Sequence, residues 1–217
     1  MTKLLRELKR ELLRQLGQRL ADFGYPSRPS GQTFYRRIAN GRTAIHAAFV
    51  EHDEDVDVTV DVAVRLDDVE DLVQRSNDML SEKEKSETFT LGVELGNLTR
   101  GEPLRWTVAD VADVSRVVEE IVALLFSVGL PYMERYSQPA AAYELLAGDE
   151  RSAWLHSPID AERAKRACAL LLVLGQASDV DDFAAKKLAF LKSNNDPGAT
   201  AFSTFAAGLR RSSKLSG

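Results

Sequence analysis

The segment that most constrains the fold is VDVTVDVAVRL, residues 56–66, in which apolar and polar residues alternate without a break. Side chains along a β-strand point alternately to the two faces of its sheet. The valines and Leu66 therefore share one face, and Asp57, Thr59, Asp61 and Arg65 share the other. This pattern is typical of a strand in an antiparallel sheet with one face on the core and one polar face.

The strands before this segment are predicted to form two hairpins with it. Asn40-Gly41 is the strongest two-residue hairpin signal and predicts a turn at 40–41 that places Tyr35 opposite His46. A four-residue turn at 52–55 then places His46 opposite Asp61. Both turns put the apolar side chains on one face, and a one-residue slip would destroy that agreement.

The rest of the chain is predicted to be mainly helical. Leucines at helical spacing indicate an amphipathic helix near the N-terminus that ends at Gly24 and Pro26. Further helices are expected over 68–80, over 107–128 with Thr107 and Asp110 as a capping pair, and after Gly148. Residues 81–87 read as a charged loop, and 88–95 as a fourth strand.

These elements predict an α+β fold: a mostly antiparallel sheet of about four strands, covered on one face by the helices near the N-terminus, over 68–80 and over 107–128. We expect an α+β domain over residues 1–147. A C-terminal helical subdomain over 148–217 is appended to it.

Composition restricts the setting of the protein. One cysteine, Cys168, excludes an intramolecular disulfide, and its apolar neighbours indicate a buried side chain. No apolar run approaches the ~20 residues of a membrane span, and the N-terminus lacks the pattern of a signal peptide, so the cytoplasm is expected.

Residues 1–42 carry a net charge of +7, ten Lys/Arg against three Asp/Glu. Residues 51–87 carry −10, four against fourteen. Such asymmetry bears on association, although it also describes ordinary solvated surfaces.

Common catalytic and cofactor motifs do not occur in the sequence. It has no GxGxxG, P-loop, HExxH or GxSxG pattern. An EF-hand alignment from Asp53 fails, because Val58 and Val64 stand where glycine and glutamate are needed. We therefore predict no cofactor, no metal and no catalytic residue from motifs.

The polar face of the sheet is the place where ligand chemistry is most plausible on sequence grounds. The predicted register aligns Tyr35, His46 and Asp61, with Arg37 diagonal to His46. Asp61 could orient the imidazole and leave its other nitrogen free for a ligand. The alternative is an ordinary polar sheet face, since cross-strand polar pairs are common.

The stretch GLPYMERYSQPAAAYELL, residues 129–146, carries a family resemblance. It resembles the bacterial family filed as domain of unknown function 4304, and the resemblance covers roughly residues 5–147. The family's segment matches Gly129, Leu130, Pro131, Tyr132, Glu134, Arg135 and Tyr136. The resemblance implies an α+β fold and no established activity. We interpret this stretch as a structural clip, with Gly129 ending the long helix and Pro131 blocking its continuation.

These observations lead to a ranked expectation of function. The first is a bacterial, non-enzymatic protein-binding module, immunity-like or antitoxin-like. The alternative is a small-molecule-binding protein or enzyme that uses the polar sheet face around His46. The third is weak nucleic-acid association through the basic N-terminal helix, against which stand the glutamates that interrupt its basic stripe.

Overall fold

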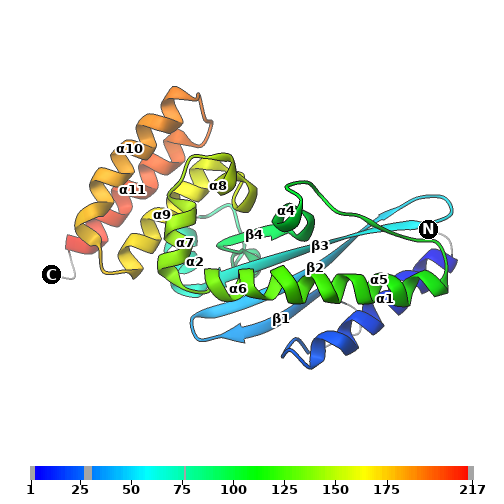
Figure 1. Ribbon diagram of the computed structural model, residues 1–217. Coiled ribbons are helices and arrows are strands. Elements are labelled where there is room, and N and C mark those ends of the chain that lie inside the picture. Colours follow the sequence, from blue (N-terminus) through cyan, green and yellow to red (C-terminus); the bar gives the residue numbers. More distant parts are fainter. Residues whose placement is uncertain (1–2, 27–30, 76, 215–217) are drawn as a thin grey trace. The chain divides into compact units, whose positions relative to one another are not determined.

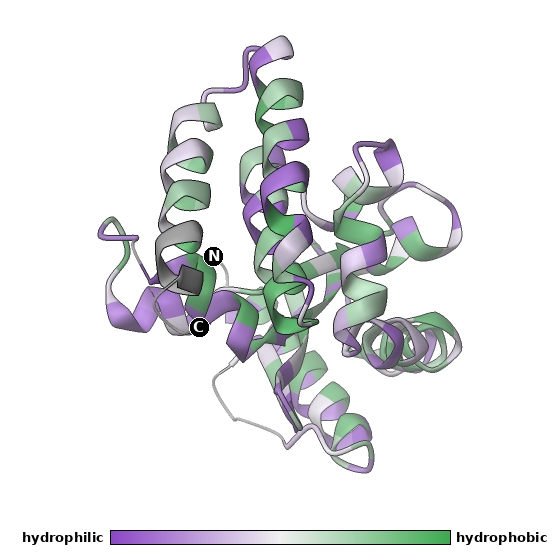
Figure 2. Ribbon diagram, turned by 90° about the vertical axis from the view of Figure 1, so that its left-hand side faces the viewer, coloured by the Kyte–Doolittle hydropathy of each residue, from purple (hydrophilic) through white to green (hydrophobic). Residues whose placement is uncertain are grey.

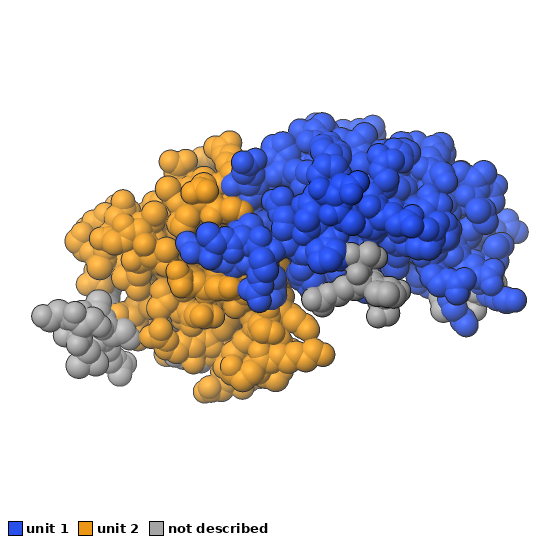
Figure 3. Space-filling view, turned by 90° about the horizontal axis from the view of Figure 1, so that it is seen from below, with its two compact units in different colours: residues 1–64, 92–134 blue, residues 65–91, 135–217 orange. Residues whose placement is uncertain are grey.

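The computed structural model describes residues 3–26, 31–75 and 77–214, the last five of them by their backbone alone. Contacts divide the chain into two compact units (Figure 3). Unit 1 is residues 1–64 with 92–134, and unit 2 is residues 65–91 with 135–217. The sequence placed the boundary at 147, whereas segments 65–91 and 135–147 group here with the C-terminal helices. The reason is visible in the packing, because the helices in these segments lie against the first long C-terminal helix.

The described residues form a five-stranded sheet, and the α+β prediction is confirmed (Figure 1). Strands β1, β2, β3 and β4 follow one another in space, and β5 also pairs with β3. The β1–β2 and β3–β5 pairs are antiparallel. The strands are β1 Thr33–Ile38, β2 Gly41–Glu51, β3 Val56–Leu66, β4 Leu91–Glu94 and β5 Trp106–Val108.

The first hairpin turns one residue earlier than predicted, so each residue of β1 pairs with a residue two positions earlier in β2. Ile38 pairs with Gly41, and His46 lies opposite Thr33 and not Tyr35. Gly41 is the first residue of β2 with φ 143°, a conformation that favours glycine, and the turn is Ala39-Asn40. A slip of two residues keeps every side chain on its face, so the apolar pattern could not distinguish the two registers.

The core of unit 1 lies between the valine face of β3 and two helices. Helices α1 (Lys3–Ala21) and α5 (Val111–Leu124) pack against each other, α1 also contacts β2, and α5 also contacts β5 (Figure 1). The buried side chains include the even-numbered β3 valines, Leu5, Leu8, Leu12, Leu16, Leu20, Val114, Val118 and Ile121. The buried Tyr25 hydroxyl lies 2.7 Å from the Thr43 hydroxyl, so this polar pair is satisfied inside the core.

Helix α5 begins and ends differently from the prediction. Asp110 alone is its N-cap, accepting from the backbone N–H groups of Ala112 and Asp113, while Thr107 lies in β5. After Leu124 the chain continues through a π-helical turn, η1 Leu125–Gly129, into α6 Leu130–Tyr136. The expected stop at Gly129 was therefore wrong.

Gly129 has a different role, which is close packing. A Cβ there would lie 3.0 Å from Leu125 Cδ2 and 3.1 Å from Leu95 Cδ2, so a larger residue would displace core side chains. Pro131 lies inside α6, which continues directly from the π-helical turn, so the prediction that Pro131 blocks the helix was also wrong.

Two local signals were missed between β3 and β5. Residues Glu82–Glu87 form helix α3, because Ser81 and Glu84 make a complete capping box. The Glu94 side chain caps α4 (Leu95–Thr99) by accepting from the Gly96 and Asn97 N–H groups. Strand β4 is consequently shorter than predicted. The helix expected over 68–80 is α2 Asp67–Gln74, and Ser76 lies outside the described residues.

Unit 2 is built around helix α9 (Asp160–Val173), which contacts α2, α7, α10 and α11. Hydrophobic and hydrophilic residues alternate along these helices, as expected for helices that bury one face (Figure 2). Cys168 is buried in this core, and burial raises the pKa of its thiol to about 12. The remaining helices are α7 Pro139–Leu146, α8 Arg151–His156, η2 Ala177–Asp179, α10 Val180–Ser193 and α11 Ala199–Lys214.

A buried ion pair joins α2 to α9. Glu70 is fully buried, and its carboxylate accepts from Arg166 Nε at 2.9 Å and from Gln74 Nε2 at 3.4 Å. Burial alone would raise the pKa of Glu70, but the charge and hydrogen bond of Arg166, with smaller contributions from Thr88 and Arg65, outweigh it and leave the pKa lowered. The carboxylate therefore depends on its arginine.

We predict that Arg166→Met destabilises the protein by about 3–5 kcal/mol, because it leaves the Glu70 charge buried and unpaired. The double variant Glu70→Leu/Arg166→Met should recover most of that loss, since no charge remains. Urea unfolding measures both. Arg14→Met, which removes an exposed ion pair with Glu11, is the control, and its free energy of unfolding should stay close to that of the parent. A double variant no more stable than the single one would contradict this account.

Candidate functional site

The polar sheet face brings together two of the four predicted residues, His46 and Asp61, and adds Thr33. The Thr33 hydroxyl lies 2.8 Å from His46 Nδ1, which fixes the imidazole ring. Asp61 on β3 lies near enough to interact electrostatically with His46. Burial raises the pKa of Asp61, and the charge of His46 partly opposes that rise. The predicted row of Tyr35, His46 and Asp61 is thus replaced by Thr33, His46 and Asp61.

Tyr35 and Arg37 lie on the same face but further along β1. Tyr35 pairs with Ala44, and its ring is 5.2 Å from the Arg42 guanidinium. Arg37 pairs with Arg42 and is exposed. A ligand at His46 would therefore meet a hydroxyl, an imidazole and a carboxyl group first. Such a set can bind polar ligands or hold a proton.

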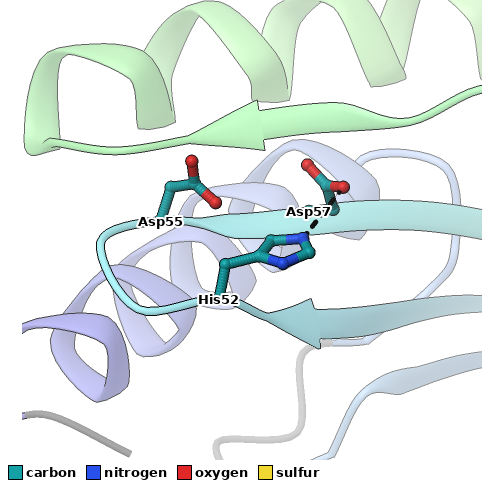
Figure 4. Close-up of side chains that lie close together, drawn as sticks. All are labelled: His52, Asp55 and Asp57. Atoms are coloured by element: carbon teal, nitrogen blue, oxygen red, sulfur yellow. Dashed lines mark hydrogen bonds and ion pairs between the residues drawn. The ribbon is translucent and has the colours of Figure 1, made fainter.

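A second cluster lies where β2 turns into β3. His52 Nε2 is 3.2 Å from Asp57 Oδ2, and the ligand atoms of His52, Asp55 and Asp57 lie within 4.8 Å of one another (Figure 4). Thr107 on β5 donates to Asp57 Oδ1 at 2.7 Å. Arg105 lies 3.9 Å from Asp57 Oδ2. The Thr107 hydrogen bond, with smaller contributions from His52 and Arg105, lowers the pKa of Asp57 despite desolvation.

One imidazole and two carboxylates resemble the ligands of a divalent metal. However, Asp57 already has a partner for each oxygen, and the Arg105 guanidinium places a positive charge beside one of them. The better account of this cluster is an ionic clip that ties the β2–β3 turn to β5.

An open hollow of unit 1 is lined by residues of β5, α5 and the segments beside them, and sequence reasoning missed it. Its volume is about 710 Å³. We call it the arginine groove, and it is lined by Arg100, Leu104, Arg105, Trp106, Thr107, Arg116, Glu120, Ala123, Leu124 and Ser127. The available signal was a pair of arginines, Arg100 and Arg105, in a segment interpreted as a plain loop.

The groove has an excess of positive charge. Arg116 is held by Asp113 at 2.8 Å and Glu120 at 3.0 Å. The Arg105 side chain is 60% exposed, and its contact with Asp57 is long. Within the described part of the chain, the Arg100 guanidinium has no hydrogen bond or ion pair. Arg100 and Arg105 are therefore the two cations best able to meet an anion.

The basic residues of α1 are mostly engaged with acids. Lys9 pairs with Glu51 at 2.7 Å and Arg19 with Glu119 at 2.5 Å. Arg14 pairs with Glu11 at 2.5 Å, within the same helix. These pairs weigh against a free basic stripe for nucleic acid.

The family-marker segment looks structural. Tyr132 and Met133 are buried, and Met133 Sδ lies 3.6 Å from the Tyr25 hydroxyl. Glu134 is exposed, and the Arg135 guanidinium lies 5.3 Å from the Tyr136 ring. These contacts are those of anchors and surface residues.

Comparisons with protein-family models, curated proteins and solved structures each gave no match. The resemblance to domain of unknown function 4304 thus stays a prediction. None of the helices in the described residues combines the length and apolarity needed to cross a membrane.

We predict that Asp57→Asn lowers the melting temperature at pH 5–7 by removing the ionic clip. Because the folded pKa of Asp57 is lowered, its stabilising effect is present above the unfolded value of about 3.9 and is lost as pH falls through the folded value. The difference from the parent should therefore shrink below about pH 4. Asp55→Asn is the matched control and should change little. A difference that stays constant with pH would contradict the clip.

Proposed function

We propose that this chain is a non-enzymatic binding module and that unit 1 recognises an acidic segment of a partner protein in the arginine groove. The observation that carries the proposal is the presence of two exposed arginines, Arg100 and Arg105, in the lining of one groove, whose third arginine, Arg116, already pairs with Asp113 and Glu120.

The chemistry of these residues suits carboxylates. The guanidinium group offers a planar fork of donors that matches a carboxylate in a bidentate geometry. Arginine and aromatic residues are also enriched at protein interfaces, and Trp106 lies in the wall of the groove. Exposed positive charge further accelerates the encounter with an acidic partner.

The proposal includes an immunity-like or antitoxin-like role for the protein. An immunity-like or antitoxin-like protein of the bacterial cytoplasm acts by holding one partner protein, and complementary charge supplies specificity and a fast association rate. Nucleic acid is a poorer fit, because the cations of α1 are largely paired.

We predict that Arg100→Glu/Arg105→Glu abolishes the capture of acidic proteins that the parent retains from a lysate. The parent complex should also dissociate as salt rises, because exposed charge pairs are screened. Arg6→Glu/Arg10→Glu makes the same charge change on the exposed face of α1 and should leave capture intact. Quantitative mass spectrometry of the bound proteins gives the readout. If both double variants retain the same proteins from the lysate, the arginine groove is not the binding surface.

A second candidate is a small-molecule site around His46, favoured by the raised pKa of Asp61. A carboxylate whose ionisation costs stability is often retained for function. This candidate is weaker because His46 lines neither the arginine groove nor the hollow of unit 2 that is lined by Leu72, Val73 and Phe205.

We predict that Asp61→Asn raises the melting temperature at pH 7. Because the pKa of Asp61 is raised in the folded state, the fold favours the protonated carboxyl group. Its contribution to folding stability is full below the unfolded pKa and is lost as the pH rises through the folded pKa. The gain should vanish below about pH 4, where the parent is protonated too. In a thermal-shift screen, small polar ligands should stabilise the parent and not Asp61→Asn. Ligands that stabilise both equally would rule this site out.

A further inference from the structure

We infer that the acidic partner segment binds in extended conformation, as an added strand along the outer edge of β5. This inference rests on the proposed function of the arginine groove and adds the mode of binding. Three features of the groove support it: the run of residues in one wall, the unpaired edge of β5, and the positions of the arginines.

The first wall of the groove is a strand edge. Trp106 and Thr107 of β5 line it, together with Leu104 and Arg105, which precede the strand. Successive side chains of a strand point to opposite faces, so one face of β5 would contribute only every second residue. Two consecutive β5 residues in one lining therefore indicate that the groove borders the edge of β5.

The second wall is one stripe of helix α5, continued by η1. Arg116, Glu120 and Ala123 recur at intervals of four and three residues, which places them on one face of α5, and Ser127 of η1 follows four residues later. This stripe consists of small and charged residues along most of its length. It leaves room beside β5 for an extended chain.

The outer edge of β5 has no strand of the described residues along it. Strand β5 pairs with β3 on one side only, with Val56 opposite Val108 and Val58 opposite Trp106. Trp106 and Val108 are buried, so the strand is anchored and its edge is held in place. An edge of this kind offers unpaired backbone N–H and C=O groups to another chain.

The arginines define the sequence of the added strand. In an extended peptide, every second side chain lies on the same face, about 7 Å from the next. Arg100 and Arg105 are exposed in the same lining. A segment with an acid at every second position would direct its carboxylates to them and leave the intervening side chains facing away.

The test uses an eight-residue acetylated peptide, (Glu-Val)4, labelled for fluorescence anisotropy at low salt. We expect it to bind the parent protein and to bind Arg100→Glu/Arg105→Glu at least about tenfold more weakly, a loss that corresponds to one strong contact. The matched peptide (Lys-Val)4 should not bind. Amide hydrogen exchange at residues 105–108 should slow when (Glu-Val)4 is bound.

Backbone pairing is tested separately from charge. Two versions of (Glu-Val)4 are methylated on the nitrogens of either all Glu or all Val residues, which blocks one or the other edge of the peptide without changing its charge. At least one version should lose binding by about tenfold or more. If both methylated versions bind as tightly as the unmethylated peptide, strand addition is overturned and the proposed charge recognition stands. Unchanged affinity for Arg100→Glu/Arg105→Glu, or no binding by (Glu-Val)4, would overturn both.

Discussion

The burial of the even-numbered face of β3 is the constraint on which the rest of unit 1 depends. Val56, Val58, Val60, Val62 and Val64 are all fully or almost fully buried. Strand β3 is also central in the sheet, with β2 on one side and both β4 and β5 on the other. Because its side chains alternate strictly, burying the valines forces Asp57 and Asp61 onto the opposite face. The candidate polar sites are thus a direct consequence of the core.

The arginine groove depends on the same strand. Val58 pairs with Trp106 and Val56 with Val108, so the apolar face of β3 continues into β5. The intervening pair, Asp57 and Thr107, is joined through a side-chain hydrogen bond on the other face. Strand β5 is only three residues long, and these contacts on both faces hold it in position. Because β5 is held in place beside α5, Arg100, Arg105 and Arg116 line one surface.

The sequence predicted elements best where a pattern repeats over many residues. The leucine stripe of α1 and the alternation of β3 were read correctly, because burial of one face determines them. The predicted hairpin register was wrong by two residues. Both registers place every side chain on the same face of the sheet, and only the conformation of Gly41 distinguishes them. Helices α3 and α4 were missed because their caps, Ser81 with Glu84 and the Glu94 side chain, are short-range signals.

The candidate site was only partly predictable for a related reason. His46 and Asp61 could be placed together from strand alternation, which is a local rule. The arginine groove instead requires that residues near 100–107 lie beside residues near 116–127, across a turn whose geometry no periodic pattern encodes. Charge asymmetry along the chain pointed to the basic N-terminal segment, yet the cations there are mostly neutralised by nearby acids. Net charge of a segment therefore identifies a binding surface poorly, because the relevant quantity is the charge that remains after internal pairing. By that measure the ion pairs of α1 leave Arg6 and Arg10, whereas Arg100 and Arg105 differ from them in lining one groove together.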